Sequence, residues 1–433
     1  MRLSTLVLSL FLTVTLCATA QNNGEKVKYV DDEDCGCELV FIDGIQTTER
    51  NKLFGFKRED GTVICEPKYM YVDRFHGDYC KVYTSDTTCG MIDRNGREIV
   101  PPVYNAIRYP SEGLIAVGRN GMWGFIDTAG RTVIKPQYRT VSDFKEGLAV
   151  VLIDFDSFSI GYGYIDTTNT LVIPAIYEYA ETFNEGYAVV VAYERYGMID
   201  HNNREVLPCK YLRVTSMMNG CFFAVDELEE RAALFNNKFK RLTGFVYSSI
   251  NGYNEDYYVV GRDGKKTFLG RNGKEYFGMY DNAGIFYDGY AKVSNGGKWG
   301  IINKRGKIIL PIEYDDGGMH STSYTFSENL ALVEKDGKIG FVNKHGKIVI
   351  PIEYESAHHC TEGLIPVKKN GMWGYVDKGG HMVCDFLYDA ATHFTWGRAT
   401  VAVGGTSYRI NPDGECVKAC KTYPKYIKWN FKN

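Results

Sequence analysis

Two segments of the chain, RNGMWGFIDTAGRTVIKPQY at residues 119–138 and KNGMWGYVDKGGHMVCDFLY at residues 369–388, are close copies of each other. Each contains an Asn-Gly pair, a Trp-Gly pair, an Asp with a Gly three residues later, and a final Tyr. Self-similarity of this kind is the mark of a repeat architecture, in which each copy is one small structural unit. The two segments therefore raise the question of how far the same unit extends along the chain.

The glycine of the Trp-Gly pair marks a position that recurs every 33 to 40 residues along the chain. A Tyr follows 14 residues later in nine units, and a Gly follows six residues later in eight. This agreement at several offsets predicts about eleven tandem units of ~34 residues. The position is occupied by Gly55, Gly90, Gly124, Gly163, Gly197, Ala233, Thr267, Gly300, Gly340, Gly374 and Tyr408.

The pattern inside one unit predicts three short strands. Segments such as EGLAVVLI from Glu146 have the alternation or β-branched content of half-buried strands. Asn-Gly and Asp-Gly pairs supply the positive φ angles of primed hairpin turns. The DxxG segment reverses the chain again, and an apolar run that ends at Pro forms the third strand. DELEERAALF at 226–235 has helix-forming residues, but it falls where a unit should turn and is interpreted as a degenerate repeat.

The expected fold is all-β, with three-stranded β-meander repeats stacked in a superhelical or solenoid array, because such units gain stability from their neighbours. One or more β-propeller-like closed rings are the alternative, although propellers usually have 4 to 8 four-stranded blades. We expect a signal peptide at 1–20, an N-terminal cap at 21–54, repeats at 55–414 and a C-terminal cap at 415–433.

The N-terminus, MRLSTLVLSLFLTVTLCATAQ, has a basic flank, an apolar run and a small-x-small cleavage site. It predicts export to a secreted, periplasmic or cell-envelope location, with lipidation at Cys17 as the minor alternative. No other stretch has the ~20 apolar residues of a membrane-spanning helix. Without Arg2 the chain has 49 basic and 53 acidic residues, so nothing favours nucleic acid. Cleavage leaves 11 of the 12 cysteines, which permits but does not require disulfides, for example between Cys416 and Cys420.

Residues that recur in every unit are expected to serve the repeat, because a catalytic group is needed once. Asp and Asn alternate at the DxxG turn, and a turn cap explains both residue types, whereas a general acid explains only Asp. The recurring Tyr is assigned to core packing. The His358-His359-Cys360 segment has ligand types, but neighbouring strand residues point to opposite faces. We expect no catalytic residue, no cofactor and no metal site. The turn residues are Asp93, Asp127, Asp166, Asp200, Asp377, Asn236, Asn303 and Asn343.

Places that break the repeat are the better functional candidates. Insertions at 153–162 and 315–326 account for the two longest spacings, and insertions in repeat proteins often serve binding. Trp396 replaces the acidic residue that precedes Gly in many units. Tolerated length drift and simple packing are the alternatives. The candidate partner-binding residues are Phe155, Phe158, Tyr162, His320, Tyr324 and Trp396.

These units closely resemble the WG repeat, a bacterial β-repeat named for the pair seen at 123–124, 299–300 and 373–374. The resemblance covers about residues 55–414, and several units replace the Trp with Cys, Tyr or Ile. It implies an all-β repeat protein, commonly secreted or envelope-associated, in a family with no shared activity. The leading hypothesis is a binding or scaffolding surface for a protein or glycan of the cell envelope. The alternatives are a glycan-active enzyme with a loop-built site and a passive spacer.

Overall fold

The computed structural model describes residues 27–32, 37–156, 159–228, 230–315 and 325–417. Every regular element in these ranges is a β-strand, and all pairs of strands are antiparallel neighbours in sequence. The strands form eleven small sheets. The first sheet has β1 (Val27–Asp32), β2 (Cys37–Ile42), β3 (Ile45–Arg50), β4 (Leu53–Arg58) and β5 (Val63–Tyr69).

Six sheets have four strands, and the first strand of most is only two residues long. They are β6 (Tyr71–Val72), β7 (Tyr79–Ser85), β8 (Thr88–Asp93), β9 (Glu98–Tyr104); β10 (Ala106–Ile107), β11 (Leu114–Arg119), β12 (Met122–Asp127), β13 (Thr132–Tyr138); β17 (Tyr179–Ala180), β18 (Tyr187–Ala192), β19 (Arg195–Asp200), β20 (Glu205–Tyr211); β24 (Ser249–Asn254), β25 (Tyr257–Arg262), β26 (Lys265–Gly270), β27 (Glu275–Tyr280); β28 (Asn282–Ala283), β29 (Tyr290–Asn295), β30 (Lys298–Asn303), β31 (Ile308–Tyr314); and β35 (Ser356–Ala357), β36 (Leu364–Lys369), β37 (Met372–Asp377), β38 (Met382–Tyr388).

Four sheets have three strands. They are β14 (Leu148–Asp156), β15 (Ser159–Asp166), β16 (Leu171–Tyr177); β21 (Arg213–Val214), β22 (Cys221–Val225), β23 (Ala232–Asn236); β32 (Leu330–Lys335), β33 (Lys338–Asn343), β34 (Ile348–Tyr354); and β39 (Ala390–Ala391), β40 (Ala399–Val403), β41 (Thr406–Ile410).

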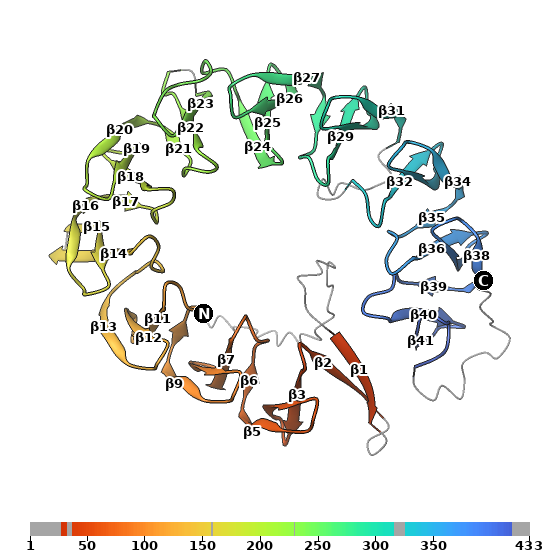
Figure 1. Cartoon of the computed structure of the whole chain (residues 1–433), viewed down its shortest axis with the longest axis horizontal. Helices are drawn as coiled ribbons and strands as arrows, with labels where there is room; N and C mark the ends of the chain where they lie inside the picture. The colour runs from red at the N-terminus through yellow and green to blue at the C-terminus, as the bar shows by residue number, and fades with distance from the viewer. Residues whose placement is uncertain (1–26, 33–36, 157–158, 229, 316–324, 418–433) are drawn as a thin grey trace, which may run out of the picture.

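The eleven sheets follow one another around a nearly complete circle (Figure 1). In this view β1 and β2 lie between the rest of the first sheet and the last sheet, β39 to β41. The expected all-β fold of tandem repeats is confirmed. Residues 232–235, the end of the segment interpreted as a degenerate repeat, lie in β23. The two-residue strand that opens most units was not expected, because two residues are too few to show an alternating pattern.

The glycine of each Trp-Gly pair faces a β-bulge in the next strand. In the sheet β10 to β13, Trp123 pairs with Tyr138 and Phe125 pairs with Ile134, so extra residues of β13 crowd against Gly124. A Cβ on Gly124 would lie 2.3 Å from the carbonyl oxygen of Ile134. The unit around Thr267 tolerates a side chain, and the Thr267 hydroxyl donates a hydrogen bond to a carbonyl oxygen at 2.9 Å. The same crowding occurs at Gly55, Gly90, Gly163, Gly197, Gly300, Gly340 and Gly374.

The hydrophobic core is divided among the units and lies between neighbouring sheets. One cluster joins Val150 and Tyr164 of one sheet to Phe183 and Val190 at the next, and the other clusters repeat this pattern. Each sheet therefore depends on its neighbours for burial, as expected for a repeat array. The long third strands lie at the outside of the circle, for example β20 and β31 (Figure 1). The expectation that these strands end at Pro is wrong, because β13, β16, β31 and β34 continue through the Pro to the recurring Tyr. A Pro is tolerated there because an edge strand has no ladder bond to lose at the missing N–H.

The recurring Tyr is a core residue whose hydroxyl joins neighbouring units. Tyr69, Tyr247, Tyr354 and Tyr388 are among those almost completely buried. Four of the hydroxyls donate hydrogen bonds of 2.6 to 3.0 Å to a side chain of the next unit. The expected packing role of these residues is confirmed. The four pairs are Tyr69 with Glu98, Tyr138 with Asn169, Tyr177 with Asn203, and Tyr247 with Glu275.

Candidate functional site

The recurring Asp and Asn residues of the DxxG turn are turn caps. In all eight turns the side-chain oxygen accepts hydrogen bonds from the backbone N–H groups two and four residues ahead, at 2.8 to 3.1 Å. Asp and Asn present the same oxygen, which explains why both occur. The predicted structural role is confirmed, and these carboxylates are already engaged.

Substitution of Asp200 checks this assignment. Asp200 is 8 % exposed, and it accepts N–H bonds from Asn202 and Arg204, both at 2.9 Å. We expect Asp200→Ala to lower the free energy of unfolding by about 1.5 kcal/mol, because two N–H groups lose their acceptor. Asp200→Asn should cost less than half of this, since the oxygen remains. Urea unfolding measures both, and equal losses in the two variants would contradict a capping role.

A second recurring carboxylate links each unit to the next. In six units a Glu lies in a turn with φ between +46° and +53°, an uncommon conformation for a non-glycine residue. Gly follows this Glu in four of the units, and Asp or Asn follows it in the other two. The Glu carboxylate accepts backbone N–H bonds from the equivalent turn of the following unit, at 2.7 to 3.2 Å. We call these residues the glutamate clasp: Glu112, Glu146, Glu185, Glu255, Glu328 and Glu362.

The clasp was missed by sequence reasoning, although its signal is the Glu-Gly pair that opens many units. Within one unit this pair indicates only the start of a strand, because a contact between units leaves no trace there. Because each clasp carboxylate accepts backbone N–H bonds from the following unit, the clasp is a structural device.

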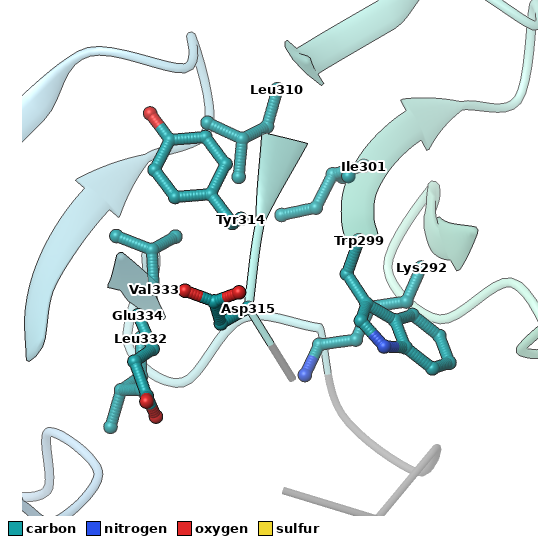
Figure 2. A pocket seen from close by; sticks show the side chains of 10 residues that line it. Lys292, Trp299, Ile301, Leu310, Tyr314, Asp315, Leu332, Val333 and Glu334 are labelled. Atoms are coloured by element: carbon teal, nitrogen blue, oxygen red, sulfur yellow. The ribbon is translucent and has the colours of Figure 1, made fainter. Parts of the chain in front are cut away.

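A small cavity lies between the units of β30 and β32 (Figure 2). Lys292 and Asp315 point toward it, and the Trp299 ring lies beside Lys292. Its volume of about 30 Å³ has room for one or two water molecules only. Asp315 accepts a hydrogen bond from the backbone of Asp336 at 3.1 Å, and its bond with Lys298 holds the pKa of this carboxyl below its usual value.

The bond made by Asp315 is another repeated device. A side chain at the start of a unit accepts a backbone N–H from the hairpin between the first two long strands of that unit. Because the same bond recurs around the ring, the cavity at Asp315 is part of the junction between units and offers no ligand site. The other acceptors are Asn105, Glu178, Asp281, Glu355 and Asp389.

The last unit breaks the clasp at Trp396. This residue has the φ of a clasp turn, +52°, and Gly397 behind it is held by the Glu362 carboxylate. Trp396 carries a half-buried indole in place of the carboxylate. The guanidinium carbon of Arg74, in the loop between β6 and β7, lies 5.9 Å from the centre of the Trp396 ring. The contact brings together the second sheet and the last sheet of the ring.

Further aromatic and imidazole groups lie in the two sheets that make this contact and in the sheets next to them. On one side His358 stacks on Trp373 at 5.0 Å between ring centres and lies 6.2 Å from His393. On the other side Tyr109 contacts His76 at 4.7 Å between ring centres and the Lys81 ammonium at 4.4 Å. We call this set the closure cluster: Arg74, His76, Lys81, Tyr109, His358, Trp373, His393 and Trp396.

The two permanent cations of the closure cluster have no anionic partner in the described ranges. Neither Arg74 nor Lys81 forms an ion pair there, and neither side chain donates a hydrogen bond to another described residue. Asp73 precedes Arg74 in sequence, and its backbone N–H donates a hydrogen bond to the Lys81 carbonyl oxygen at 2.9 Å. Burial, with a contribution from the charge of Asp73, raises the pKa of Tyr109 to about 12, so Tyr109 keeps its proton at neutral pH.

The histidines of the cluster give a pH prediction. Burial and the nearby His393 lower the pKa of His358, and burial lowers that of His393 against the opposing charge of Glu362. A histidine in the unfolded chain titrates at about pH 6.5. The folded chain therefore binds protons at His358 and His393 less readily than the unfolded chain does. The stabilisation is present above that pH and is lost as the pH falls through it.

We therefore expect the Tm to fall between about pH 7.5 and about pH 5.5, and to fall less in H358Q/H393Q. Thermal unfolding of both proteins at the two pH values measures this difference. The carboxylates with lowered pKa titrate at lower pH and should contribute equally in both proteins. An identical fall in Tm would show that these two histidines are not the groups responsible.

The candidate partner-binding residues predicted from the sequence do not form one site among the described residues. Trp396 belongs to the closure cluster. Tyr162 packs against Tyr179 at 5.8 Å between ring centres and contributes to the core, away from that cluster. The insertion at 153–162 lengthens the hairpin of β14 and β15, as expected. Phe158, His320 and Tyr324 lie outside the described residues, and so does the side chain of Phe155.

Other site types find little support in the described part of the chain. No group of three His, Cys, Asp or Glu side chains is placed there to hold a metal ion. Cys416 is disulfide-bonded. Seven other cysteines carry free thiols, and burial raises the pKa of each. Among the described residues there is no helix that is long and apolar enough to cross a membrane.

Solved structures similar to this chain show low identity. A structure titled as the eukaryotic initiation factor is 12 % identical over 69 % of this chain and 93 % of its own, with a TM-score of 0.36. BamB from Moraxella catarrhalis is 10 % identical over 65 % and 98 %, with a TM-score of 0.30. Kluyveromyces lactis Hsv2p is 10 % identical over 64 % and 96 %, with a TM-score of 0.28. At these TM-scores the similarities carry no argument about function.

No curated protein matches the chain. The model of the WG containing repeat matches it eight times, and together the matches span more than half of the residues. The first match begins in β8 of the second sheet, and the last match ends in β41 of the last sheet. The matched units are those in which the β-bulge and the glutamate clasp recur. The matches are at 90–123, 123–154, 162–192, 196–225, 278–299, 299–338, 339–373 and 373–406. The chain belongs to the family of proteins with WG containing repeats.

Proposed function

We propose that this WG-repeat chain is a secreted or periplasmic protein that provides a binding or scaffolding surface for a partner at the cell envelope. The observation that carries the proposal is the Arg74–Trp396 contact, where the repeat is broken and two segments distant in sequence meet. A residue that departs from a repeated structural role is free to take another one. The ring supplies a preorganised support, which reduces the entropy lost on binding.

The carboxylates of the repeat favour binding over catalysis. The turn caps and the clasp residues accept backbone N–H bonds. At the turn cap Asp166, a hydrogen bond from the Thr168 side chain together with backbone N–H bonds lowers the pKa of the carboxyl. A general acid at neutral pH needs a raised pKa instead. A glycan-active enzyme with a site built from loops remains the alternative, because the two insertions supply unique residues.

Export and binding have separate tests. For export, the full chain and a chain lacking residues 2–20 are compared by cell fractionation, and we expect only the full chain outside the cytoplasm. For binding, the full chain is crosslinked in its native cells beside an unrelated exported protein. We expect discrete crosslinked species specific to this chain. Cytoplasmic retention of the full chain would overturn the export proposal, and hydrolysis of envelope glycans by the purified chain would favour the enzyme.

A further inference from the structure

We infer that the closure cluster is a docking site for an acidic segment of a partner protein. The inference rests on the proposed function, because it names the surface and the partner class for the binding role. It starts from the two cations that the described chain leaves without an anion, Arg74 and Lys81.

Each of these cations is held against an aromatic ring, which leaves its donors available. The Arg74 guanidinium lies over Trp396, and the Lys81 ammonium lies over Tyr109. Arg has five N–H donors in a planar fork and Lys has three, and the described protein accepts none of them here. A carboxylate from a partner can take two Arg donors in a bidentate pair while the indole keeps the guanidinium in position.

The residue types also match those that dominate protein interfaces. Trp, Tyr and Arg are enriched among the side chains that carry most of the binding energy. Trp396 and Arg74 meet here, and Tyr109 and Trp373 lie in the sheets next to theirs. Trp396, Tyr109 and Trp373 are half-buried, so their remaining exposed faces can receive apolar side chains. His358 and His393, whose pKa is lowered by burial, add uncharged rings at neutral pH. An acidic protein segment offers carboxylates and apolar groups together, whereas an acidic polysaccharide offers mainly charge.

The replacement of the clasp residue is part of this arrangement. Six units have Glu at the position of Trp396. A Glu at 396 would place a carboxylate of the chain itself beside Arg74 and would compete with the partner. Trp396→Glu therefore removes the aromatic surface and supplies an internal anion, and it is expected to abolish docking while restoring the residue that most other clasp turns use.

The experiment uses the full chain and two defined polymers. A random copolymer of glutamate and tyrosine serves as the acidic polypeptide, and polygalacturonate of matched charge serves as the acidic polysaccharide. We expect the full chain to bind the copolymer at least about tenfold more tightly than polygalacturonate, with affinity that falls as salt rises. Arg74→Glu and Trp396→Glu should each weaken copolymer binding at least about tenfold.

Two control variants carry the same kinds of substitution, a charge reversal and an aromatic-to-Glu replacement, outside the closure cluster. Lys274→Glu reverses an exposed charge in the turn between β26 and β27, across the circle from the closure cluster (Figure 1). Tyr193→Glu replaces an aromatic residue that is 90 % exposed and has a φ of +53°, close to that of Trp396. Both should bind the copolymer like the parent chain. Thermal unfolding of all four variants checks the fold, and Trp396→Phe, which keeps a ring, should retain most of the binding.

Any of the following results would overturn the inference that the closure cluster binds an acidic protein segment. Equal binding of both polymers would show a general anion surface, stronger binding of polygalacturonate would point to a glycan, and no binding would leave the cluster without this role. Copolymer binding that survives Arg74→Glu and Trp396→Glu would place it elsewhere. The proposed function fails separately, through loss of export or of crosslinked partners. Crosslinking that persists in Trp396→Glu would overturn this inference while leaving the binding role intact.

Discussion

Replacement of Gly124 by Ala is expected to lower the free energy of unfolding by about 3 kcal/mol, at the upper end for an overpacked site. The added Cβ would lie 2.3 Å from the Ile134 carbonyl oxygen and 2.6 Å from the backbone of Lys135 and Pro136. These are backbone atoms of a bulged strand, which cannot swing aside as a flexible side chain can. Relief of the clash requires the separation of β12 from β13.

The matched control for this substitution is Gly244→Ala. At Gly244 the new Cβ would meet only a side-chain methyl group of Val246 at 3.4 Å, an ordinary contact, and φ is not positive. We expect a change in the free energy of unfolding within about 0.5 kcal/mol. Urea unfolding of both variants measures the difference. If Gly124→Ala were as stable as the parent chain, the bulge would not be the reason for a glycine in the Trp-Gly pair.

Removal of a clasp carboxylate is expected to have the next largest effect. Glu185 accepts hydrogen bonds from the N–H groups of Asn219 at 2.7 Å and Gly220 at 2.8 Å, one on each carboxylate oxygen. Glu185→Ala leaves both donors without their acceptor, and we expect a loss of about 2 kcal/mol, because bonds to a charged group contribute more than neutral ones. Glu185→Gln keeps one acceptor and should lose about half as much.

The loss of stability in Glu185→Ala should be local, so hydrogen exchange provides a second measurement. Hydrogen exchange at residues 219–225 should accelerate in Glu185→Ala, because the clasp joins two units whose stability depends on their contact. Glu49→Ala is the control, since Glu49 is exposed on β3 and makes no contact with a charged or polar partner among the described residues. Unchanged exchange at 219–225 with a normal Tm would mean that the clasp does not hold the units together.

Much of the unit could be predicted because its determinants lie within a few residues of one another. Asn120 and Gly121 have φ values of +53° and +77°, the positive angles that the Asn-Gly pair predicts for a primed hairpin. The side chains of Asp93 and Asn303 cap their turns as expected from their alternation. These features depend on local backbone preferences, which a single sequence displays directly.

The functional candidate was only partly predictable. Trp396 could be identified because it interrupts a pattern, but nothing in the sequence near it indicates Arg74. The two residues meet because many small rotations between successive sheets add up to a nearly complete circle. Each rotation depends on side-chain packing between neighbouring sheets, so the sum is not visible in any one unit.

The sequence by itself determined the repeat, its strands and turns, and the structural use of the Asp, Asn and Tyr positions, because hydrogen bonding within a turn and alternating burial act over short distances. The tertiary structure decided three things: the glutamate clasp, the bulge that requires glycine in the Trp-Gly pair, and the meeting of Arg74 with Trp396. All three depend on the relative placement of backbones from different strands or units. That placement is set by how whole sheets pack, and it gives Trp396 the cationic partner on which the proposed binding site is built.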